Sequence, residues 1–534
     1  MTPAAVVGAG PVGLTLAGRL AQQGVRCQVF DDRPRHQAAG SRAICMQRET
    51  LEIWQRLGIG QAVADRGAQW RIGRTYFRDR ELFSVELPGA GDEHFPPFVN
   101  ISQSEVEEML LARLAELGVE VRWGHRLTAI RDGTDGVRLT FSTAAGDVEV
   151  AAEQVIGTDG AHSGVRHALG MGFPGHSFED LFLIADVRAG LPFPSERRFY
   201  FDPPWNPGRQ VLIHPQPDDC WRIDWQVASD TDVEDERRSG RLDRRIRAVI
   251  GDAEYELVWL TMYRFHQRIA PAFRRGHAFL AGDAAHLMSP FGARGLNSGV
   301  ADAENLAWKL ASVLRGDAPP ELLASYDLER RAAALENLAV TDATMRFMVP
   351  RGRVRRTWRN LALRGSVRSA WFRRRVNSGR LAQPFSYADS PLIDRGGSAP
   401  GLPELGGVAP DAAVRCPADQ TIRRLRELLG GRFVLLLVGG DAMQATRLAE
   451  SLPAPAQRPP IRVVASGLGE PHPGVTLLDD ITRRLERVYA PSGPRAWLIR
   501  PDGHLAATRP IDDQLDAAAV GRLLSAATGG AASQ

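Results

Sequence analysis

The 534-residue chain is poor in cysteine, almost free of lysine, and without any long hydrophobic run. Its four cysteines, Cys27, Cys45, Cys220 and Cys416, lie far apart and form no CxxC or CxxH pair. This spacing argues against a structural zinc site, a dithiol redox centre and a disulfide framework, and it predicts a reducing, cytoplasmic setting. No apolar stretch approaches the roughly 18 residues that a membrane-spanning helix needs. We therefore expect no membrane segment.

An excess of charge of one sign is also missing, because 66 basic and 63 acidic side chains leave a net charge of +3. A dedicated nucleic-acid binder carries a stronger basic bias, so we expect no nucleic-acid partner. The arginine-rich stretch 351–375 is either a nucleic-acid patch or the solvated face of a connecting helix, and we favour the helix. The N-terminus has no basic region followed by an apolar core, so we expect no cleaved secretory signal.

The composition, 44% hydrophobic and 24% charged, is that of a globular protein, and the length predicts three or four domains. Hydrophobic patterning predicts a buried strand over 4–7, a helix over 12–23 and a second strand over 26–30. A helix is predicted over 104–117. Near the C-terminus, 496–499 and 504–508 are predicted to form a hairpin across a Pro-Asp-Gly turn.

The motif Gly8-Ala-Gly10-Pro-Val-Gly13 occupies the first turn of this β-α-β unit. Glycines there permit a tight turn and the close approach of a pyrophosphate, which the helix N-terminus attracts. Asp31, at the end of the second strand, is placed to accept hydrogen bonds from ribose hydroxyls. These features predict a dinucleotide site. The alternative is a structural turn with a solvated Asp31.

Two further motifs follow strands. The first is Gly157-Thr-Asp159-Gly160, and the second runs from Phe279 through Asp283 and a glycine-rich loop to a helix that begins near Asn297. The strand of the second motif would deliver Asp283 to a polar cofactor arm. The helix N-terminus would then stabilise negative charge on a bound ring. His286 lies within this motif without a partner at ligand spacing, so we interpret it as a packed structural histidine rather than a base or ligand.

Together these motifs resemble the single-component FAD-dependent aromatic hydroxylases of the p-hydroxybenzoate hydroxylase fold. The branch is similar to 3-(3-hydroxyphenyl)propionate hydroxylase and to the phenol and polyketide hydroxylases, over residues 6–350. The resemblance implies an α/β fold with a Rossmann-like FAD-binding domain, an antiparallel-sheet substrate domain and a thioredoxin-like C-terminal α/β domain. We expect an FAD-binding domain over 1–175 and 273–350, a substrate sheet over 176–272, a helical connector over 351–395 and the C-terminal domain over 396–534.

The thioredoxin-like domain lacks paired cysteines, since Cys416 stands alone. We therefore expect a scaffold or dimer-contact role for it rather than redox work. The resemblance also implies non-covalent FAD, NAD(P)H and O2 as co-substrates, no metal, and a small aromatic substrate. The protein would be a monomer or a homodimer.

Carried over position by position, the family's cofactor contacts fall on residues of all three motifs and on two positions between them. Arg42 would reach the flavin, Gln103 would lie near the ribityl and phosphate groups, and Asp159-Gly160 would serve both FAD and the pyridine nucleotide. The full implied set is Gly8, Gly10, Gly13, Asp31, Arg42, Gln103, Asp159, Gly160, Asp283, Pro290, Gly295, Leu296 and Asn297, with Pro290 at the reacting edge of the ring.

One position departs from the family pattern. The loop is often Gly-Gln-Gly or Gly-Phe-Gly in the family, whereas this chain has Ala293-Arg294-Gly295. Arg294 would add positive charge beside the flavin, clamp an acidic substrate, or point to solvent.

The implied reaction is hydroxylation of a phenolic or related aromatic compound through a flavin C4a-hydroperoxide. Epoxidation and Baeyer–Villiger oxygenation use the same cofactor chemistry and stay open as alternatives, as does a non-catalytic FAD-binding scaffold. A halogenase is disfavoured because the chain has no Trp-x-Trp-x-x-Ile-Pro segment.

The sheet over 178–259 would cover the flavin and supply the substrate pocket. Strand alternation places Arg222 and Gln226 on one face and Trp225 on the other. A base that removes the phenolic proton would activate the ring, and His214 or His266 is a candidate because imidazole titrates near neutral pH. The alternative is that both histidines are structural. The predicted substrate contacts are Tyr200, Arg222, Trp225, Gln226 and Arg264.

Overall fold

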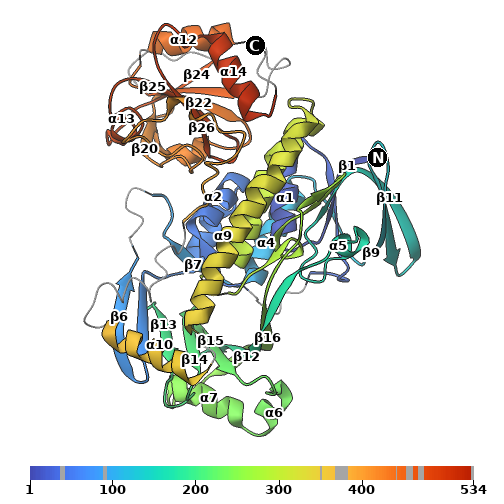
Figure 1. The fold of residues 1–534 in the computed structure, drawn as a ribbon, viewed down its shortest axis with the longest axis vertical. Helices are drawn as coiled ribbons and strands as arrows, with labels where there is room; N and C mark the ends of the chain where they lie inside the picture. Colours follow the sequence, from blue (N-terminus) through green and yellow to red (C-terminus); the bar gives the residue numbers. More distant parts are fainter. Residues whose placement is uncertain are drawn as a thin grey trace.

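The structure is a computed structural model that describes residues 1–36, 43–87, 93–290, 292–348, 352–366, 383–440, 442–452, 461–466 and 474–530. Along the long axis the C-terminal region lies at one end (Figure 1). An antiparallel sheet with helices α6 (Val233–Arg238) and α7 (Arg241–Ile250) lies at the other, and the N-terminal β-α-β region lies between them. No described helix is long and apolar enough to cross a membrane.

The first sheet is built on parallel strands in the order β18-β11-β1-β2-β8. Strand β1 (Thr2–Val7) is buried from Ala4 onward, as its small and β-branched residues suit a strand covered on both faces. Val7 pairs with Gly157, and Gly157 pairs with Leu280. The three motifs therefore begin at one edge of one sheet. Its other elements are α1 (Pro11–Gln22), β2 (Cys27–Phe30), β8 (Val121–Arg122), β9 (Arg126–Asp132), β10 (Val137–Thr143), β11 (Gly146–Gly157), β17 (Arg274–Arg275) and β18 (Ala278–Leu280).

The second sheet has the strand order β19-β16-β12-β15-β14-β13-β5-β6. Strands β5 and β6 come from the part of the chain predicted to belong wholly to the FAD-binding domain, and here the structure differs from the prediction. They join this sheet because β5 pairs in parallel with β13, a long-range pairing that local patterning does not encode. The strands are β5 (Ile72–Phe77), β6 (Arg80–Glu86), β12 (Gly175–Arg188), β13 (Arg197–Phe201), β14 (Gln210–Pro215), β15 (Cys220–Val227), β16 (Glu256–Ile269) and β19 (His286–Leu287).

The two faces of this second sheet have different partners. On one face Trp225 and Ile223 pack against Leu242 and Ile246 of α7. The other face carries a separate apolar cluster that includes Met345 of α9 (Ala324–Met348) and Leu363 of α10 (Arg353–Ser366). The helix α10 accounts for the described part of the arginine-rich stretch.

The C-terminal region is a five-stranded mixed sheet in the order β24-β23-β22-β25-β26. Its last two strands, β25 (Arg495–Ile499) and β26 (Leu505–Pro510), form the predicted hairpin. The other elements are β20 (Ala413–Cys416), β21 (Thr421–Arg424), β22 (Phe433–Val438), α12 (Ala442–Ser451), β23 (Ile461–Ser466), β24 (Val475–Leu478), α13 (Arg484–Tyr489) and α14 (Ala517–Ala527).

Shorter elements connect these regions. A small sheet in the order β3-β7-β4 lies beside helices α2 and α3. The remaining elements are β3 (Cys45–Gln47), α2 (Arg48–Leu57), α3 (Gly60–Arg66), β4 (Ala68–Gln69), β7 (Phe98–Asn100), α4 (Gln103–Glu116), α5 (Gly164–Ala168) and α8 (Gly295–Leu314).

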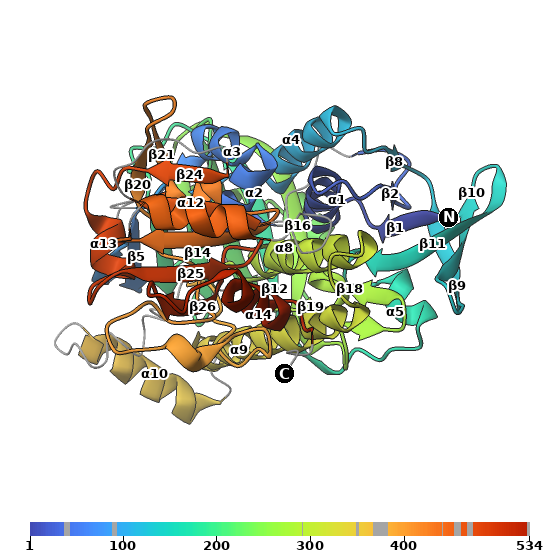
Figure 2. The same cartoon turned by 90° about the horizontal axis from the view of Figure 1, so that it is seen from above.

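A buried ion network joins the C-terminal hairpin to α8 and α9. Glu329 accepts hydrogen bonds from Arg500 Nη1 at 2.6 Å and from Lys309 Nζ at 2.7 Å. Arg500 also contacts Asp502 at 2.6 Å, and the side chains of all four residues are at most 2% exposed. Burial lowers the pKa of Lys309 to about 8. The C-terminal region is thus held by paired charges. Figure 2 shows it lying over these helices.

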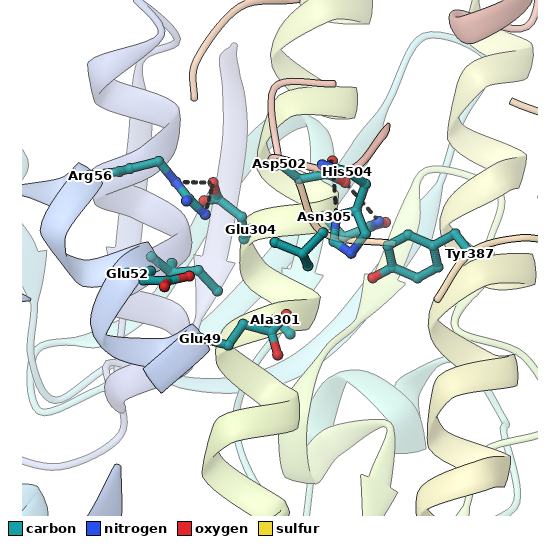
Figure 3. A pocket seen from close by; sticks show the side chains of 11 residues that line it. Glu49, Glu52, Arg56, Ala301, Glu304, Asn305, Tyr387, Asp502 and His504 are labelled. Atoms are coloured by element: carbon teal, nitrogen blue, oxygen red, sulfur yellow. Dashed lines mark hydrogen bonds and ion pairs between the residues drawn. The ribbon is translucent and has the colours of Figure 1, made fainter. Parts of the chain in front are cut away.

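A small polar cavity lies beside this network, lined by α2, α8 and the C-terminal hairpin (Figure 3). Arg56 bridges to Glu304 on one side, while Asn305, Asp502 and His504 lie on the other. The free space is about 20 Å³. That is enough for about one water molecule, so this cavity is too small for an aromatic substrate.

Replacing Arg500 by Met should destabilise the protein strongly, because Glu329 and Asp502 would be left as poorly compensated buried carboxylates. We expect a loss of about 3–5 kcal/mol in the free energy of unfolding, measured by urea titration with tryptophan fluorescence. The control is Arg138→Met, which removes an exposed ion pair with Glu149 and should leave the urea midpoint unchanged. Equal effects of the two substitutions would contradict this account of the interface.

Candidate active site

The first glycine turn leaves an open space at one position only. Gly8 has φ +112°, and a Cβ there would lie 2.5 Å from the Thr158 carbonyl oxygen. A Cβ on Gly13 would lie 2.0 Å from the Gly8 carbonyl oxygen. At Gly10, by contrast, a Cβ would meet no described atom within 4 Å. Gly8 and Gly13 are thus required by the protein's own packing, whereas Gly10 borders free space at the N-terminus of α1, where a phosphate binds favourably.

Asp31 is held within the turn. It is 7% exposed, and its Oδ2 accepts a hydrogen bond from Ala9 N at 2.7 Å. Arg33, which sequence reasoning missed, donates from Nε to Asp31 Oδ1 at 2.8 Å. Arg33 also lies 3.6 Å from Glu107, which accepts a hydrogen bond from Gln103 Nε2 at 2.9 Å. The structure therefore links Asp31 and Gln103 through a chain of charged groups. A ribose contact by Asp31 stays a prediction.

Asp159 has one satisfied and one unsatisfied oxygen. Its Oδ2 accepts a hydrogen bond from Val165 N at 3.0 Å at the start of α5. Its Oδ1 is buried without a partner among the described residues, and burial raises the pKa of the carboxyl group. Gly160, with φ +78°, turns the chain directly after it. An orphaned oxygen at the edge where the three motifs meet is a place for a ligand hydrogen bond.

The loop that precedes α8 (described residues 282–290 and 292–294), which we call the cofactor loop, is tied to β3 by one side chain at the start of α8. Asn297 Oδ1 accepts from Gln47 N at 2.9 Å and Thr50 Oγ1 at 2.7 Å. Its Nδ2 donates to the carbonyl oxygens of Cys45 at 2.9 Å and Ala293 at 2.6 Å. The resemblance implied only a backbone contact at Asn297, so this structural role of its side chain was missed.

The remaining predicted residues of this loop lie close by. Asp283 is half-buried in the turn Gly282–Ala284, Pro290 is exposed, and Gly295 begins α8. Leu296 packs against the core of the first sheet.

Asp302, on α8, supports this loop from behind. Its carboxylate accepts hydrogen bonds from Gly282 N at 2.9 Å, His286 Nε2 at 2.7 Å and Arg330 Nε at 2.6 Å. Burial acts to raise the pKa of Asp302, but Arg330 and His286 outweigh it and hold the pKa below its usual value. His286 is fully buried, which agrees with its interpretation as a structural histidine.

Arg42 and Arg294 also belong to the predicted flavin environment. Arg42 falls outside the described residues, so its predicted role is not addressed by the structure. Arg294 donates a hydrogen bond to Asn337 of α9. This contact with a neighbouring helix argues against the third alternative, a side chain directed to solvent. The other two alternatives stay predictions.

The second sheet, which we call the covering sheet, presents a row of polar side chains on the face opposite α7. His214 pairs across the strands with Arg222, and Arg222 pairs with Asp186. Arg222 binds Asp186 through two hydrogen bonds of 2.7 Å, and its guanidinium lies 5.2 Å from the Trp259 ring centroid. His214 Nδ1 lies 3.8 Å from Cys45 Sγ. Since Cys45 is tied to Asn297, this face is directed toward the cofactor loop.

Gln226 lies on the same face and donates a hydrogen bond to Asp180. Trp225 and Tyr200 lie on the opposite face, where Trp225 is fully buried and Tyr200 stacks on Tyr76 at 4.4 Å. Their inclusion among the substrate contacts is corrected on this ground, because both side chains lie on the face of the sheet opposite to Arg222 and His214.

The two candidate histidines also lie on opposite faces. Alternation along β16 places His266 and Arg264 on the face of Met262, away from Phe265 and His214. His266 bonds Ser177 Oγ at 2.8 Å. Burial, with Arg197 and Arg222, lowers the pKa of His214 well below its usual value, so His214 stays neutral and is a poor proton acceptor. The two histidines therefore cannot contact one and the same ligand on either face of the sheet.

These observations fit FAD. The open space at Gly10, the N-terminus of α1 and the orphaned Asp159 Oδ1 lie along one sheet edge, as a pyrophosphate and its ribose require. The loop before α8 continues from that edge, so its helix N-terminus would face the ring. Within the described residues there is no cluster of metal-ligating side chains.

Gly10→Ala and Gly13→Ala should separate cofactor binding from folding. Gly10→Ala is expected to leave the melting temperature of the apoprotein unchanged and to weaken FAD binding at least about tenfold, because its methyl group would occupy the space for the phosphate. Gly13→Ala should lower the melting temperature itself, since its Cβ meets backbone. Titration of flavin fluorescence and thermal unfolding of the apoproteins measure both. Unchanged FAD affinity in Gly10→Ala would contradict this placement.

Comparison with known proteins agrees with this geometry. The family model described as FAD binding domain matches residues 1–341. The chain is 33% identical to 6-methylpretetramide 4-monooxygenase of Streptomyces rimosus over 94% of this chain and 90% of that one. It is 32% identical to a 3-(3-hydroxy-phenyl)propionate/3-hydroxycinnamic acid hydroxylase of Mycolicibacterium smegmatis over 68% of this chain and 64% of that one.

Two solved structures share the whole architecture. A ternary complex of aklavinone-11 hydroxylase with FAD and aklavinone superposes with a TM-score of 0.80 at 25% identity over 99% of both chains. The flavin-dependent monooxygenase PieE, in complex with FAD and substrate, has the same fold, with a TM-score of 0.82 at 22% identity over 98% of both chains. The chain therefore belongs to the family of FAD-dependent aromatic hydroxylases that its three glycine-rich motifs resemble.

Proposed function

We propose that this FAD-dependent aromatic hydroxylase consumes NAD(P)H and O2 and acts on a phenolic substrate of one or several rings. The observation that carries the proposal is the connection between the two halves of the site. Asn297 ties the cofactor loop to β3, and Cys45 of β3 lies against the polar face of the covering sheet. A ring compound held by that face would lie over the cofactor.

When bound, FAD supplies hydride acceptance from NAD(P)H and the activation of O2. The chain's own residues would bind and orient FAD and the substrate and shield them from water. The N-terminus of α8 favours negative charge on the ring edge nearest to it. The covering sheet excludes water, which strengthens the electrostatic interactions beneath it. The name of one relative, a 3-(3-hydroxy-phenyl)propionate/3-hydroxycinnamic acid hydroxylase, supports a phenolic substrate.

The opposite face of β16 offers a place for the nicotinamide cofactor. Burial, together with Arg268, Arg264 and His162, lowers the pKa of His266, so these four basic groups lie near one another. His162 follows the Asp159-Gly160 turn in the chain. His162 and Arg264 are exposed. Basic side chains of this kind bind phosphates, and we assign Arg264 and His266 to the NAD(P)H phosphates instead of the aromatic substrate.

Purified protein should be yellow, with one FAD per chain, and phenols should stimulate its NAD(P)H oxidation. A panel of simple phenols, hydroxyphenylpropionates and polycyclic phenols tests this by NAD(P)H consumption, with product mass and ring position determined for each active compound. A colourless protein that takes up no FAD, or a flavoprotein whose NAD(P)H oxidation no phenol stimulates, would contradict the proposal. Ring-oxygen insertion or epoxidation in the products would favour the alternative oxygenations.

Arg264→Gln should raise KM for NAD(P)H by about threefold to tenfold and leave kcat unchanged, because an exposed guanidinium contributes about 1 kcal/mol to phosphate binding. The increase should shrink at high salt, where such contacts are screened. Steady-state kinetics at two ionic strengths measure it, with Arg138→Gln on β10 as the control. A KM equal to that of the wild type would remove Arg264 from the nucleotide site.

A further inference from the structure

Two charged side chains on the face toward β3 lack partners. Arg197, at the start of β13, makes no hydrogen bond or ion pair among the described residues, and its guanidinium carbon lies 5.7 Å from the centroid of the Phe199 ring. Asp224, in β15, has a buried Oδ1 that no described donor reaches. Arg222 and Asp186, beside them, neutralise each other. Buried charges are normally paired, so an unpaired cation and an unpaired carboxylate on one face need an explanation.

Strand register places both side chains on the same face. Arg198 pairs with Ile213, so Arg197 lies beside His214, and His214 pairs with Arg222. Leu212 pairs with Asp224 in the next row. Directly opposed residues share a face, and this is the face that meets Cys45 and hence the cofactor loop.

The two side chains lie deep in the protein, since burial is the largest influence on the pKa of each. Each nevertheless keeps part of its surface accessible. Arg197 and Asp224 influence the pKa values of one another without forming an ion pair. Both side chains are therefore available to contact a polar group of a ligand.

The chemistry of Arg197 and Asp224 suits an acidic hydroxyl group. Arg197 offers an unoccupied guanidinium to an oxyanion. Burial raises the pKa of Asp224 to about 7, which is the range in which a carboxylate accepts a proton from a phenol or enol near neutral pH. The other titratable groups facing Asp224 are unsuited to this step. The pKa of the Cys45 thiol is about 12, His214 stays neutral, and Arg222 and Asp186 bind each other.

We propose that Asp224 and Arg197 form the subsite for the phenolic or enolic hydroxyl of the substrate, with Asp224 as the proton acceptor and Arg197 as the anchor of the resulting oxyanion. The proposal rests on the hydroxylase function. The substrate O–H bond breaks, a new O–H bond forms on the Asp224 carboxylate, and the electron pair stays on the substrate oxygen. The ring becomes more nucleophilic, and Asp224 returns the proton to solvent after product leaves. This assignment replaces His214 and His266 as candidate bases.

The test uses oxidised holoenzyme without NAD(P)H and chromogenic phenols that are un-ionised in solution at pH 8. The wild type should bind the probe with the absorbance of a phenolate while releasing no proton to a weakly buffered solution, because Asp224 keeps it. In Asp224→Asn a phenolate signal can appear only together with proton release. A wild type that binds the probe without a phenolate signal, or that releases a proton on forming one, would overturn the proposal.

The anchor is tested in the same assay. Arg197→Gln should weaken binding of the phenolate by about 10- to 100-fold, the usual effect of losing a hydrogen bond to a charged group. Arg197→Lys should restore part of it. The O-methylated probe, which has no proton to lose, should bind equally to all three proteins. Arg198→Gln, on the same strand with its guanidinium 2.9 Å from Glu196, is the control. Equal phenolate affinity in Arg197→Gln and in the wild type would overturn the assignment.

A stability measurement checks the premise that Asp224 is a buried, unpaired carboxylate. Its pKa in the folded protein lies above the ordinary value of 3.8, so it costs stability as pH rises from about 4 to about 7. Asp224→Asn should therefore melt at a higher temperature than the wild type at pH 8, and the difference should vanish near pH 4. Identical pH dependence would overturn the subsite. Failure of the hydroxylase function itself would show differently, as a phenolate signal without phenol-stimulated NAD(P)H oxidation.

Discussion

The buried carboxylate of Asp302 is the interaction on which the arrangement of the cofactor loop depends. It receives the Gly282 backbone, His286 and Arg330, so one side chain of α8 holds the strand end that carries Asp283. Arg330 continues the connection through Tyr387, whose hydroxyl lies 2.7 Å from Arg330 Nη1. A carboxylate buried this completely is stable only because all these donors converge on it. The loop therefore cannot shift without breaking several buried contacts.

The same helices, α8 and α9, also contact the C-terminal region. Glu329 directly precedes Arg330 on α9 and binds Arg500 and Lys309. Adjacent residues of one helix thus serve two networks, one toward the cofactor loop and one toward the C-terminal hairpin. The C-terminal cysteine Cys416 is buried and unpaired with another cysteine in the described chain. The scaffold or dimer-contact role expected of this region stays a prediction, and its buried charges contact the helices that border the cofactor loop.

The covering sheet carries polar side chains within an otherwise apolar layer. Paired strands bring Arg222 and Asp186 together at 2.7 Å. In this ion pair the two charges neutralise each other. Arg197 and Asp224 stay unpaired a short way along the same face. Stability alone would not favour two such groups. Their retention is understandable when a substrate completes the set of contacts.

The sequence by itself determined the elements whose chemistry is local. Strand, glycine turn and helix follow each other within a few residues, so the spacing of Gly8, Gly10 and Gly13 predicted both the β-α-β unit and its phosphate-binding edge. Asp283 and the loop before α8 were recognisable for the same reason. Asp302 lies in the helix that follows this loop, but its role needed the structure, because its partners Gly282 and Arg330 come from separate elements.

Only the tertiary structure decided which faces and which distant strands meet. Alternation separated Trp225 from Arg222, but it did not say which of them would face the cofactor, because that depends on the side that α7 covers. The pairing of β5 with β13 joins segments far apart in the chain. Arg197 and Asp224 gave no signal in sequence, since each is an ordinary charged residue in a strand. Their significance arises from strand register, which long-range packing sets and short-range spacing does not.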